Sequence, residues 1–159
     1  MTTEPKKNVV ASVLARLKNK ANQAGESYNQ LLQHYVLERF LHRLSQSRHA
    51  DDVILKGALL LKTLNLPRSR PTVDIDMLRR GKADRDTLVA LVKDCASVED
   101  PTDGVTFLSQ TIVARDIDKD GNYGGTRVSF EARIGNVRLQ MQIDFGVGDV
   151  MVPGPSRII

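Results

Sequence analysis

The chain of 159 residues is long enough for one domain with a substantial core, and its 41% hydrophobic and 26% charged residues are typical of a soluble globular protein. No apolar run approaches the length of a membrane span and no signal-peptide pattern opens the sequence, which excludes a membrane protein and predicts a cytoplasmic one. The net charge of +4 is compatible with a polyanionic partner such as RNA or a nucleoside triphosphate. The single cysteine, Cys95, excludes an internal disulfide and is expected to be a small buried side chain.

Two helices are predicted first, after a polar, flexible N-terminus at residues 1–8. Apolar residues recur at helical spacing from Val9 to Leu17 and again from Tyr28 to Leu44, and the sequence AGES at residues 24–27 separates the two runs. The basic residues of these helices lie mostly off the apolar stripes, so we expect them on solvated faces. They are Arg16, Lys18, Lys20, Arg39 and Arg43.

A short buried strand is predicted at residues 53–55, followed by Lys56-Gly57 and a helix over residues 58–64 that ends before Pro67. In the next stretch, RPTVDIDML at residues 70–78, acidic and apolar residues alternate as on a strand. A helix over residues 84–96 follows. Its inward side chains are expected to be Leu88, Leu91, Val92 and Cys95.

The last part of the sequence is predicted to be rich in strands. One strand runs through residues 105–114, and DIDKDGNYGG at residues 116–125 is expected to be a loop in which Asp116 and Asp118 are solvated. The two alternating arms TRVSFEARI and VRLQMQIDF flank Gly135-Asn136, which predicts a β-hairpin with a two-residue turn. In the second arm, Asp144 falls on the polar face.

Three carboxylates are the strongest functional signal in this pattern. Asp74 and Asp76 share one face of a strand, where two like charges repel each other and contribute nothing to folding. If the strand that carries Asp144 is a neighbour in the same sheet, all three carboxylates converge on one patch. Such a cluster suits a hard cation such as Mg²⁺, or two of them, which would remove the repulsion. The alternative for the Asp-x-Asp pair alone is a solvated strand edge.

The turn at Lys56-Gly57 adds a candidate site for phosphate groups. A glycine between a strand and a helix lets a phosphate approach the backbone, with the helix N-terminus facing it. Lys56, Arg68 and Arg70 are close enough in sequence to supply positive charge.

Four segments in this order resemble the N-terminal part of the AbiEii/AbiGii-type nucleotidyltransferase toxins of bacterial abortive-infection and toxin–antitoxin systems. They are SVLARLKNKANQAGESYNQLLQHYVLERFLHRLSQS, VILKGALLL, RPTVDIDML and LQMQIDFGVGDVMVP. The resemblance implies an α+β, polymerase-β-like nucleotidyltransferase fold, in which a mixed sheet is flanked by helices and preceded by the two N-terminal helices. It assigns residues 9–159 to this domain.

The resemblance also implies Mg²⁺-dependent transfer of a nucleotide from an NTP, with two ions and with Mn²⁺ as a substitute. The acceptor would be an RNA such as the tRNA 3′ end, and a cognate antitoxin would be a partner. The implied metal ligands and catalytic residues are Asp74, Asp76 and Asp144, the last also a base for the acceptor hydroxyl. The implied nucleotide-binding residues are Lys56, Gly57, Ala58, Arg70 and Thr72.

Two departures from the family pattern leave an alternative open. Related enzymes often carry serine or glycine where this chain has Ala58, and the sequence stops at residue 159 where the family would continue into a second, mostly helical half. The alternative is a non-catalytic nucleotide-binding or interaction module that needs a partner or the missing half. In that case an exposed C-terminal region would also allow a homo-oligomer to form.

Overall fold

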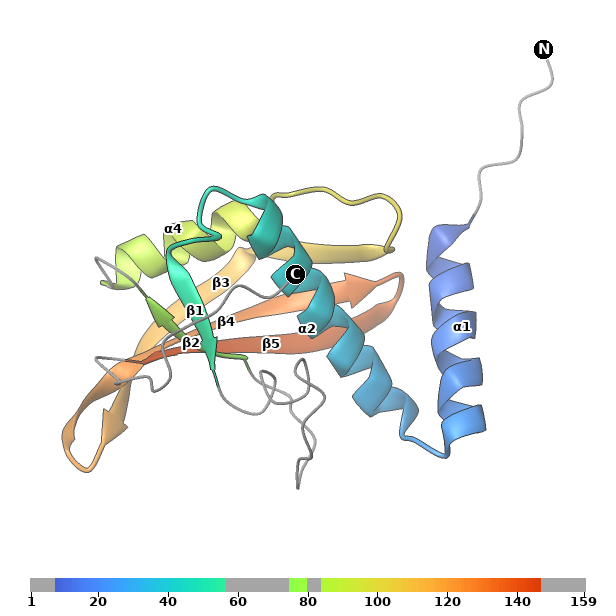
Figure 1. Cartoon of the computed structure of the whole chain (residues 1–159), viewed down its shortest axis with the longest axis horizontal. Coiled ribbons are helices and arrows are strands. Elements are labelled where there is room, and N and C mark those ends of the chain that lie inside the picture. Colours follow the sequence, from blue (N-terminus) through green and yellow to red (C-terminus); the bar gives the residue numbers. More distant parts are fainter. Residues whose placement is uncertain (1–7, 57–74, 80–83, 147–159) are drawn as a thin grey trace, which may run out of the picture.

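The computed structural model of the chain describes residues 8–56, 75–79 and 84–146. Within these ranges it contains three helices and a five-stranded mixed sheet, which is an α+β architecture (Figure 1). The elements are α1 (Val9–Ala24), α2 (Tyr28–Gln46), β1 (Val53–Lys56), β2 (Ile75–Arg79), α4 (Arg85–Ala96), β3 (Val105–Lys119), β4 (Asn122–Ile134) and β5 (Val137–Gly146).

The helices begin and end where the sequence supplies capping residues. The Asn8 side chain accepts a hydrogen bond from the Ala11 amide at 3.0 Å, and Ser27 and Asp84 do the same at the starts of α2 and α4. Gly25 ends α1 in the left-handed conformation, with φ 65°, which glycine adopts without steric cost. The predicted positions of all three helices are therefore confirmed.

The strand order in the sheet is β1-β2-β5-β4-β3. β2 and β5 run parallel, whereas the β1–β2, β5–β4 and β4–β3 pairs are antiparallel. The predicted hairpin is confirmed, since Ile134 pairs with Val137 across Gly135-Asn136. Gly135 has a φ of 60° as the first of the two turn residues, a position that glycine favours in type II′ turns.

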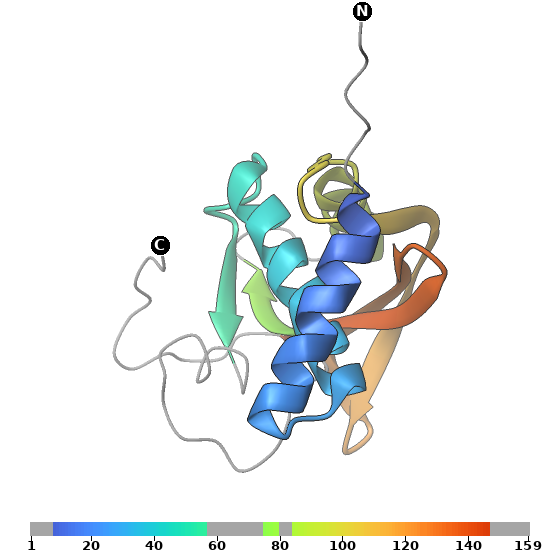
Figure 2. The same ribbon diagram turned by 90° about the vertical axis from the view of Figure 1, so that its right-hand side faces the viewer.

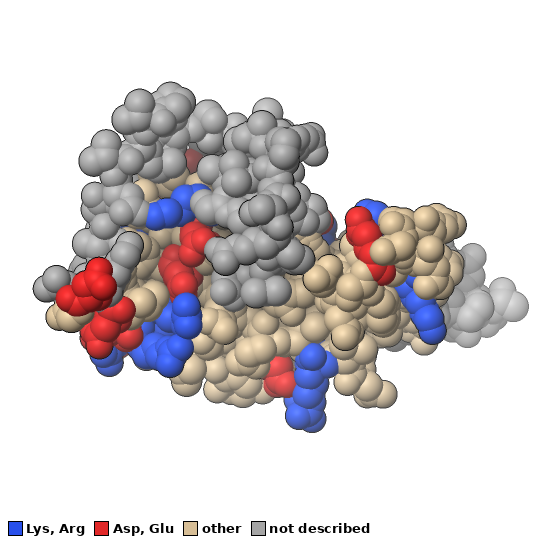
Figure 3. Space-filling model, turned by 90° about the horizontal axis from the view of Figure 1, so that it is seen from below, with Lys and Arg blue, Asp and Glu red and all other residues tan. Residues whose placement is uncertain are grey.

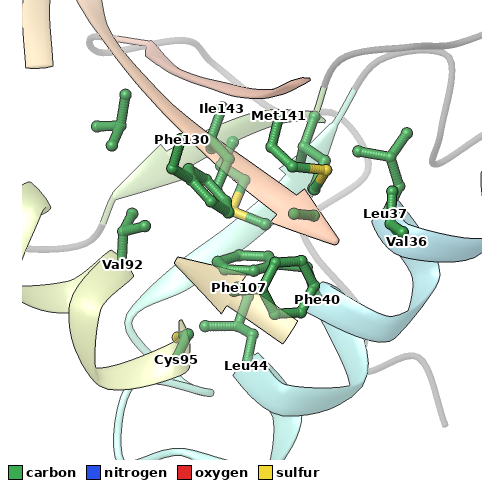
Figure 4. Close-up of a cluster of buried hydrophobic side chains, with 14 of the residues drawn as sticks. Val36, Leu37, Phe40, Leu44, Val92, Cys95, Phe107, Phe130, Met141 and Ile143 are labelled. Atoms are coloured by element: carbon green, nitrogen blue, oxygen red, sulfur yellow. The ribbon is translucent and has the colours of Figure 1, made fainter. Parts of the chain in front are cut away.

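One face of the sheet is covered by α2 and α4, and α1 packs alongside α2 (Figures 1 and 2). Phe40 of α2 contacts Phe107 and Phe130 of the sheet, with ring centroids 5.5 and 5.3 Å away (Figure 4). Cys95 is fully buried in this core, as predicted. The other inward positions predicted for α4 are also buried: Leu88, Leu91 and Val92.

The prediction of a loop at residues 116–125 is wrong. β3 continues to Lys119 and β4 begins at Asn122, so Asp116 and Asp118 lie in a strand. Asp120 and Gly121 both have positive φ values, 54° and 80°, and this geometry closes a hairpin with only two turn residues. Asp116 does not lie in a solvated turn but forms an ion pair with Arg85 at the start of α4, at 2.7 Å.

The expectation that the basic residues of α2 are solvated is wrong for Arg43, whose exposed fraction is 2%. Its guanidinium donates to both carboxylate oxygens of Asp103, at 2.9 and 3.2 Å, and to the carbonyls of Val98 and Val105. Arg39 also donates to Asp103, at 2.8 Å. Both arginines therefore attach α2 to the segment that leads into β3, and Arg43 does so without facing water.

The first predicted strand is confirmed as β1, but it is a half-buried edge strand and not a buried one. The helix predicted over residues 58–64 lies outside the described residues.

Candidate active site

Two of the predicted carboxylates lie opposite each other in the centre of the sheet. Asp76 of β2 is the direct partner of Asp144 in the parallel strand β5. The pairing continues on both sides, because Lys56 of β1 lies opposite Asp76 and Arg127 of β4 lies opposite Asp144. Directly paired residues project from the same face of a sheet, so these four side chains form one line, which we call the charged row.

The charged row lies on the face of the sheet opposite α2 and α4. The neighbours of Asp76 in sequence, Ile75 and Met77, are 0% and 1% exposed and belong to the core beneath the helices. In β5, Ile143 and Phe145 are buried in the same way, so strand alternation directs Asp144 to the opposite side. Viewed from below the orientation of Figure 1, acidic and basic groups adjoin one another on the surface (Figure 3).

Arg127 binds the Asp144 carboxylate through two hydrogen bonds. Its Nε donates to Oδ1 at 2.8 Å and its Nη2 donates to Oδ2 at 3.0 Å. Both side chains are partly buried, with 27% of Arg127 and 22% of Asp144 exposed. A guanidinium in this two-pronged arrangement compensates for the repulsion that Asp76 and Asp144 exert on each other as cross-strand neighbours.

Arg127 was not among the residues singled out from the sequence, although a signal for it exists. Counting outwards from the Gly135-Asn136 turn places Arg127 opposite Asp144, and the alternation of TRVSFEARI assigns it to the polar face. The turn and the alternation together therefore predict that the basic residue Arg127 lies opposite Asp144.

The remaining predicted site residues lie outside the described part of the chain. They are Gly57, Ala58, Arg70, Thr72 and Asp74. Within the described ranges, no group of three or more His, Cys, Asp or Glu side chains is placed to hold a metal ion, so the pair Asp76 and Asp144 is the described portion of the proposed cluster.

This arrangement suits the binding of a hard cation. Cross-strand neighbours have Cβ atoms about 5 Å apart, a separation that lets two carboxylates contribute oxygen ligands to one ion. Lys56, on the other side of Asp76, adds a positive charge that suits an anionic ligand next to the carboxylates.

A model of the family described as "Nucleotidyl transferase AbiEii toxin, Type IV TA system" matches residues 39–159. The chain belongs to this family. The match begins within α2 and includes every strand of the sheet, and so the whole charged row. The resemblance stated from the sequence is thereby confirmed, although most of its first segment, in α1 and α2, precedes the match. No curated protein matches the chain.

The family is one of nucleotidyltransferase toxins from type IV toxin–antitoxin systems, which implies an NTP as substrate and an antitoxin as partner. In the described ranges, no helix is both long and apolar enough to cross a membrane.

Proposed function

We propose that this chain is a Mg²⁺-dependent nucleotidyltransferase with a polymerase-β-like fold that transfers a nucleotide from an NTP to an acceptor. The observation that supports this proposal is the direct pairing of Asp76 with Asp144 on the face of the sheet opposite α2 and α4. Two carboxylates on neighbouring strands repel each other unless positive charge compensates for them, as Arg127 does for Asp144. A metal site gives this arrangement a function that folding alone does not.

The proposed metal ligands are Asp76 and Asp144, together with Asp74. Their donor atoms fit Mg²⁺, which prefers carboxylate oxygens and retains several water molecules. When bound, the ion would supply charge stabilisation for the phosphate groups of the NTP. Asp144 would also accept the proton of the acceptor hydroxyl, provided that this hydroxyl comes within hydrogen-bond distance.

The proposed nucleotide-binding residues lie on the side of β1. Lys56, which is paired with Asp76, would bind the triphosphate together with Gly57, Ala58, Arg70 and Thr72. A lysine next to two metal-binding carboxylates would orient the phosphates towards the metal without contacting the base. Selectivity among the four NTPs would then depend on other residues.

The proposed acceptor is an RNA, with the tRNA 3′ end as the leading candidate. The face of the sheet opposite α2 and α4 carries arginines on three strands, Arg138 on β5, Arg127 and Arg133 on β4, and Arg115 on β3. Arginines at several positions on one face give a surface for a phosphate backbone.

The proposal is tested by transfer of label from each α-labelled NTP to total RNA in the presence of Mg²⁺. We expect Asp76→Asn and Asp144→Asn to reduce transfer at least about 100-fold, as the loss of a charged catalytic group does. Circular dichroism and the thermal midpoint of each variant show whether it is folded under the conditions of the assay.

The matched control is Asp118→Asn, which makes the same charge change in the second Asp-Ile-Asp sequence, on an exposed part of β3. It should leave transfer unchanged. Transfer at the parent rate by Asp76→Asn would refute the site. Label removed by protease instead of RNase would replace the RNA acceptor with a protein. Binding of NTP and Mg²⁺ without transfer would favour the non-catalytic module.

A further inference from the structure

The ion pair between Arg127 and Asp144 has a consequence for the metal site. Both oxygens of Asp144 accept hydrogen bonds from Arg127, at 2.8 and 3.0 Å. A metal ion at Asp144 needs lone pairs of these same two oxygens. The structure thus has a guanidinium bound to one of the carboxylates that the proposed function requires for the cation.

The geometry of this pair differs from that of an ordinary surface ion pair. The two parallel N–H···O bonds fix the plane of the carboxylate as well as its position, and about three quarters of each side chain is shielded from solvent. Strand pairing holds the two Cα atoms opposite each other, so Arg127 cannot move far from Asp144 without a change of rotamer. Asp144 is consequently oriented before any ligand binds.

We propose that Arg127 is a positioning residue that orients Asp144 in the metal-free protein and gives up one of its two hydrogen bonds when the cation binds. This inference rests on the proposed metal site. It makes Arg127 a competitor of the cation, so that the site binds metal more weakly than the carboxylates alone would. In return, the bond that Arg127 keeps holds Asp144 in the orientation needed for transfer.

A purely structural role is the competing explanation, since opposite charges on neighbouring strands also stabilise a sheet. The two explanations differ in what they predict for metal binding. If the pair is purely structural, replacing Arg127 lowers the free energy of unfolding, and metal affinity falls only as far as the fold is disturbed. A competing positioning residue changes metal affinity and transfer rate in opposite directions.

The test measures Mn²⁺ affinity without nucleotide, from the loss of the free Mn²⁺ signal in electron paramagnetic resonance. We expect Arg127→Gln to bind Mn²⁺ about five- to tenfold more tightly than the parent, which is the effect of removing one nearby positive charge at an intermediate effective dielectric. At saturating metal, its rate of nucleotide transfer should fall about tenfold or more, because Asp144 is no longer fixed in orientation. Arg127→Lys keeps the charge but not the two-pronged contact, so its Mn²⁺ affinity should stay near that of the parent while its rate falls.

Arg115→Gln is the matched control, since Arg115 pairs with Arg127 and lies on the same face, one strand further from Asp144. Its Mn²⁺ affinity should change by less than about twofold, because screening by solvent weakens the interaction at this exposed position. Circular dichroism and thermal unfolding of each variant show whether it is folded under the conditions of the measurement.

A double-mutant cycle with Asp144→Asn isolates the contact between the two residues. If Arg127 acts through Asp144, Arg127→Gln should raise Mn²⁺ affinity clearly less in the Asp144→Asn background than in the parent, because only the direct repulsion between its charge and the cation remains there. Three results would overturn the inference while leaving the proposed function intact: unchanged or weaker Mn²⁺ binding by Arg127→Gln, an equal effect of Arg115→Gln, or an effect of the same size without the Asp144 carboxylate. A parent protein that binds no Mn²⁺ would refute both proposals.

Discussion

Replacing Asp103 with asparagine should strongly destabilise the fold, because it removes the negative charge that neutralises a buried guanidinium. Asp103 and Arg43 are only 3% and 2% exposed. Arg43 also lies over the ring of Phe107, with its Cζ 4.8 Å from the centroid, which limits the access of water to the guanidinium. Removing one partner of a buried ion pair costs about 3–5 kcal/mol, a large part of the about 5–15 kcal/mol that holds a typical domain folded.

For a domain of this size, such a loss corresponds to a decrease in the thermal midpoint of roughly 6–20 °C. The midpoints of parent and Asp103→Asn can be compared by circular dichroism at neutral pH, with urea unfolding giving the free-energy difference directly.

The matched control is Asp116→Asn, which breaks an ion pair with Arg85 of similar length, 2.7 Å, whose side chains are 45% and 56% exposed. Such a surface pair contributes little to stability, so its midpoint should change by only a few degrees. Equal decreases for the two variants would refute the argument that burial makes Asp103 important. An unchanged midpoint for Asp103→Asn would show that the carbonyls around Arg43 are sufficient to hold its charge.

Three further predictions concern pH and backbone geometry. Burial raises the pKa of the Cys95 thiol to about 11 from the ordinary value of 9.0, so the folded state retains this proton more firmly than the unfolded state. The free energy of unfolding should therefore decrease as the pH rises above 9.0 towards about 11, and it should decrease less in Cys95→Ala. Alkylation of Cys95 should require unfolding, and rapid alkylation of the native protein would contradict this. The hydrogen bond from Arg85 lowers the pKa of Asp116 from 3.8, so the stability it contributes is present above 3.8 and is lost as the pH falls below that value. The urea midpoints of parent and Asp116→Asn should then differ slightly at about pH 6 and converge at about pH 2.5, and a difference that persists in acid would rule out this pair as its source. Gly125 has a φ of 134°, and a Cβ atom there would lie 2.3 Å from the Phe145 carbonyl oxygen, so Gly125→Ala should separate β4 from β5 and cost about 2 kcal/mol or more. Gly121→Ala, where a Cβ atom meets nothing within 4 Å, should cost only about 1 kcal/mol in urea unfolding, and equal costs would mean that the close approach of Phe145 is unimportant.

Local sequence patterns were sufficient to predict the elements whose residues alternate or repeat clearly. The two-residue turn at Gly135-Asn136 and the alternation of the flanking arms assign Asp144 to the polar face of a strand. The same argument applies to Asp76, whose neighbours are apolar. The direct pairing of Asp76 with Asp144 could not be predicted in this way, because nothing local to either strand indicates which strands become neighbours.

The errors have different physical origins. The turn at Asp120-Gly121 was hidden by polar residues on both sides, so the composition of a loop outweighed the Asp-Gly signal of a hairpin. Arg43 was misplaced because its burial depends on Asp103, which approaches α2 only in the folded protein. A pattern of charges along one helix does not indicate a partner that is distant in sequence.

The parallel pairing of β2 with β5 also affects the order in which the parts of the candidate active site come together during folding. β3, β4 and β5 are consecutive and joined by tight turns, so they can pair from local contacts alone. Asp76 reaches Asp144 only when β2 joins this meander across α4 and two strands, a closure with a larger entropic cost. We infer that a nascent or partly folded chain has Asp144 already held by Arg127 but lacks its acidic neighbour. Chemistry that needs both carboxylates would then begin only after β2 has paired with β5.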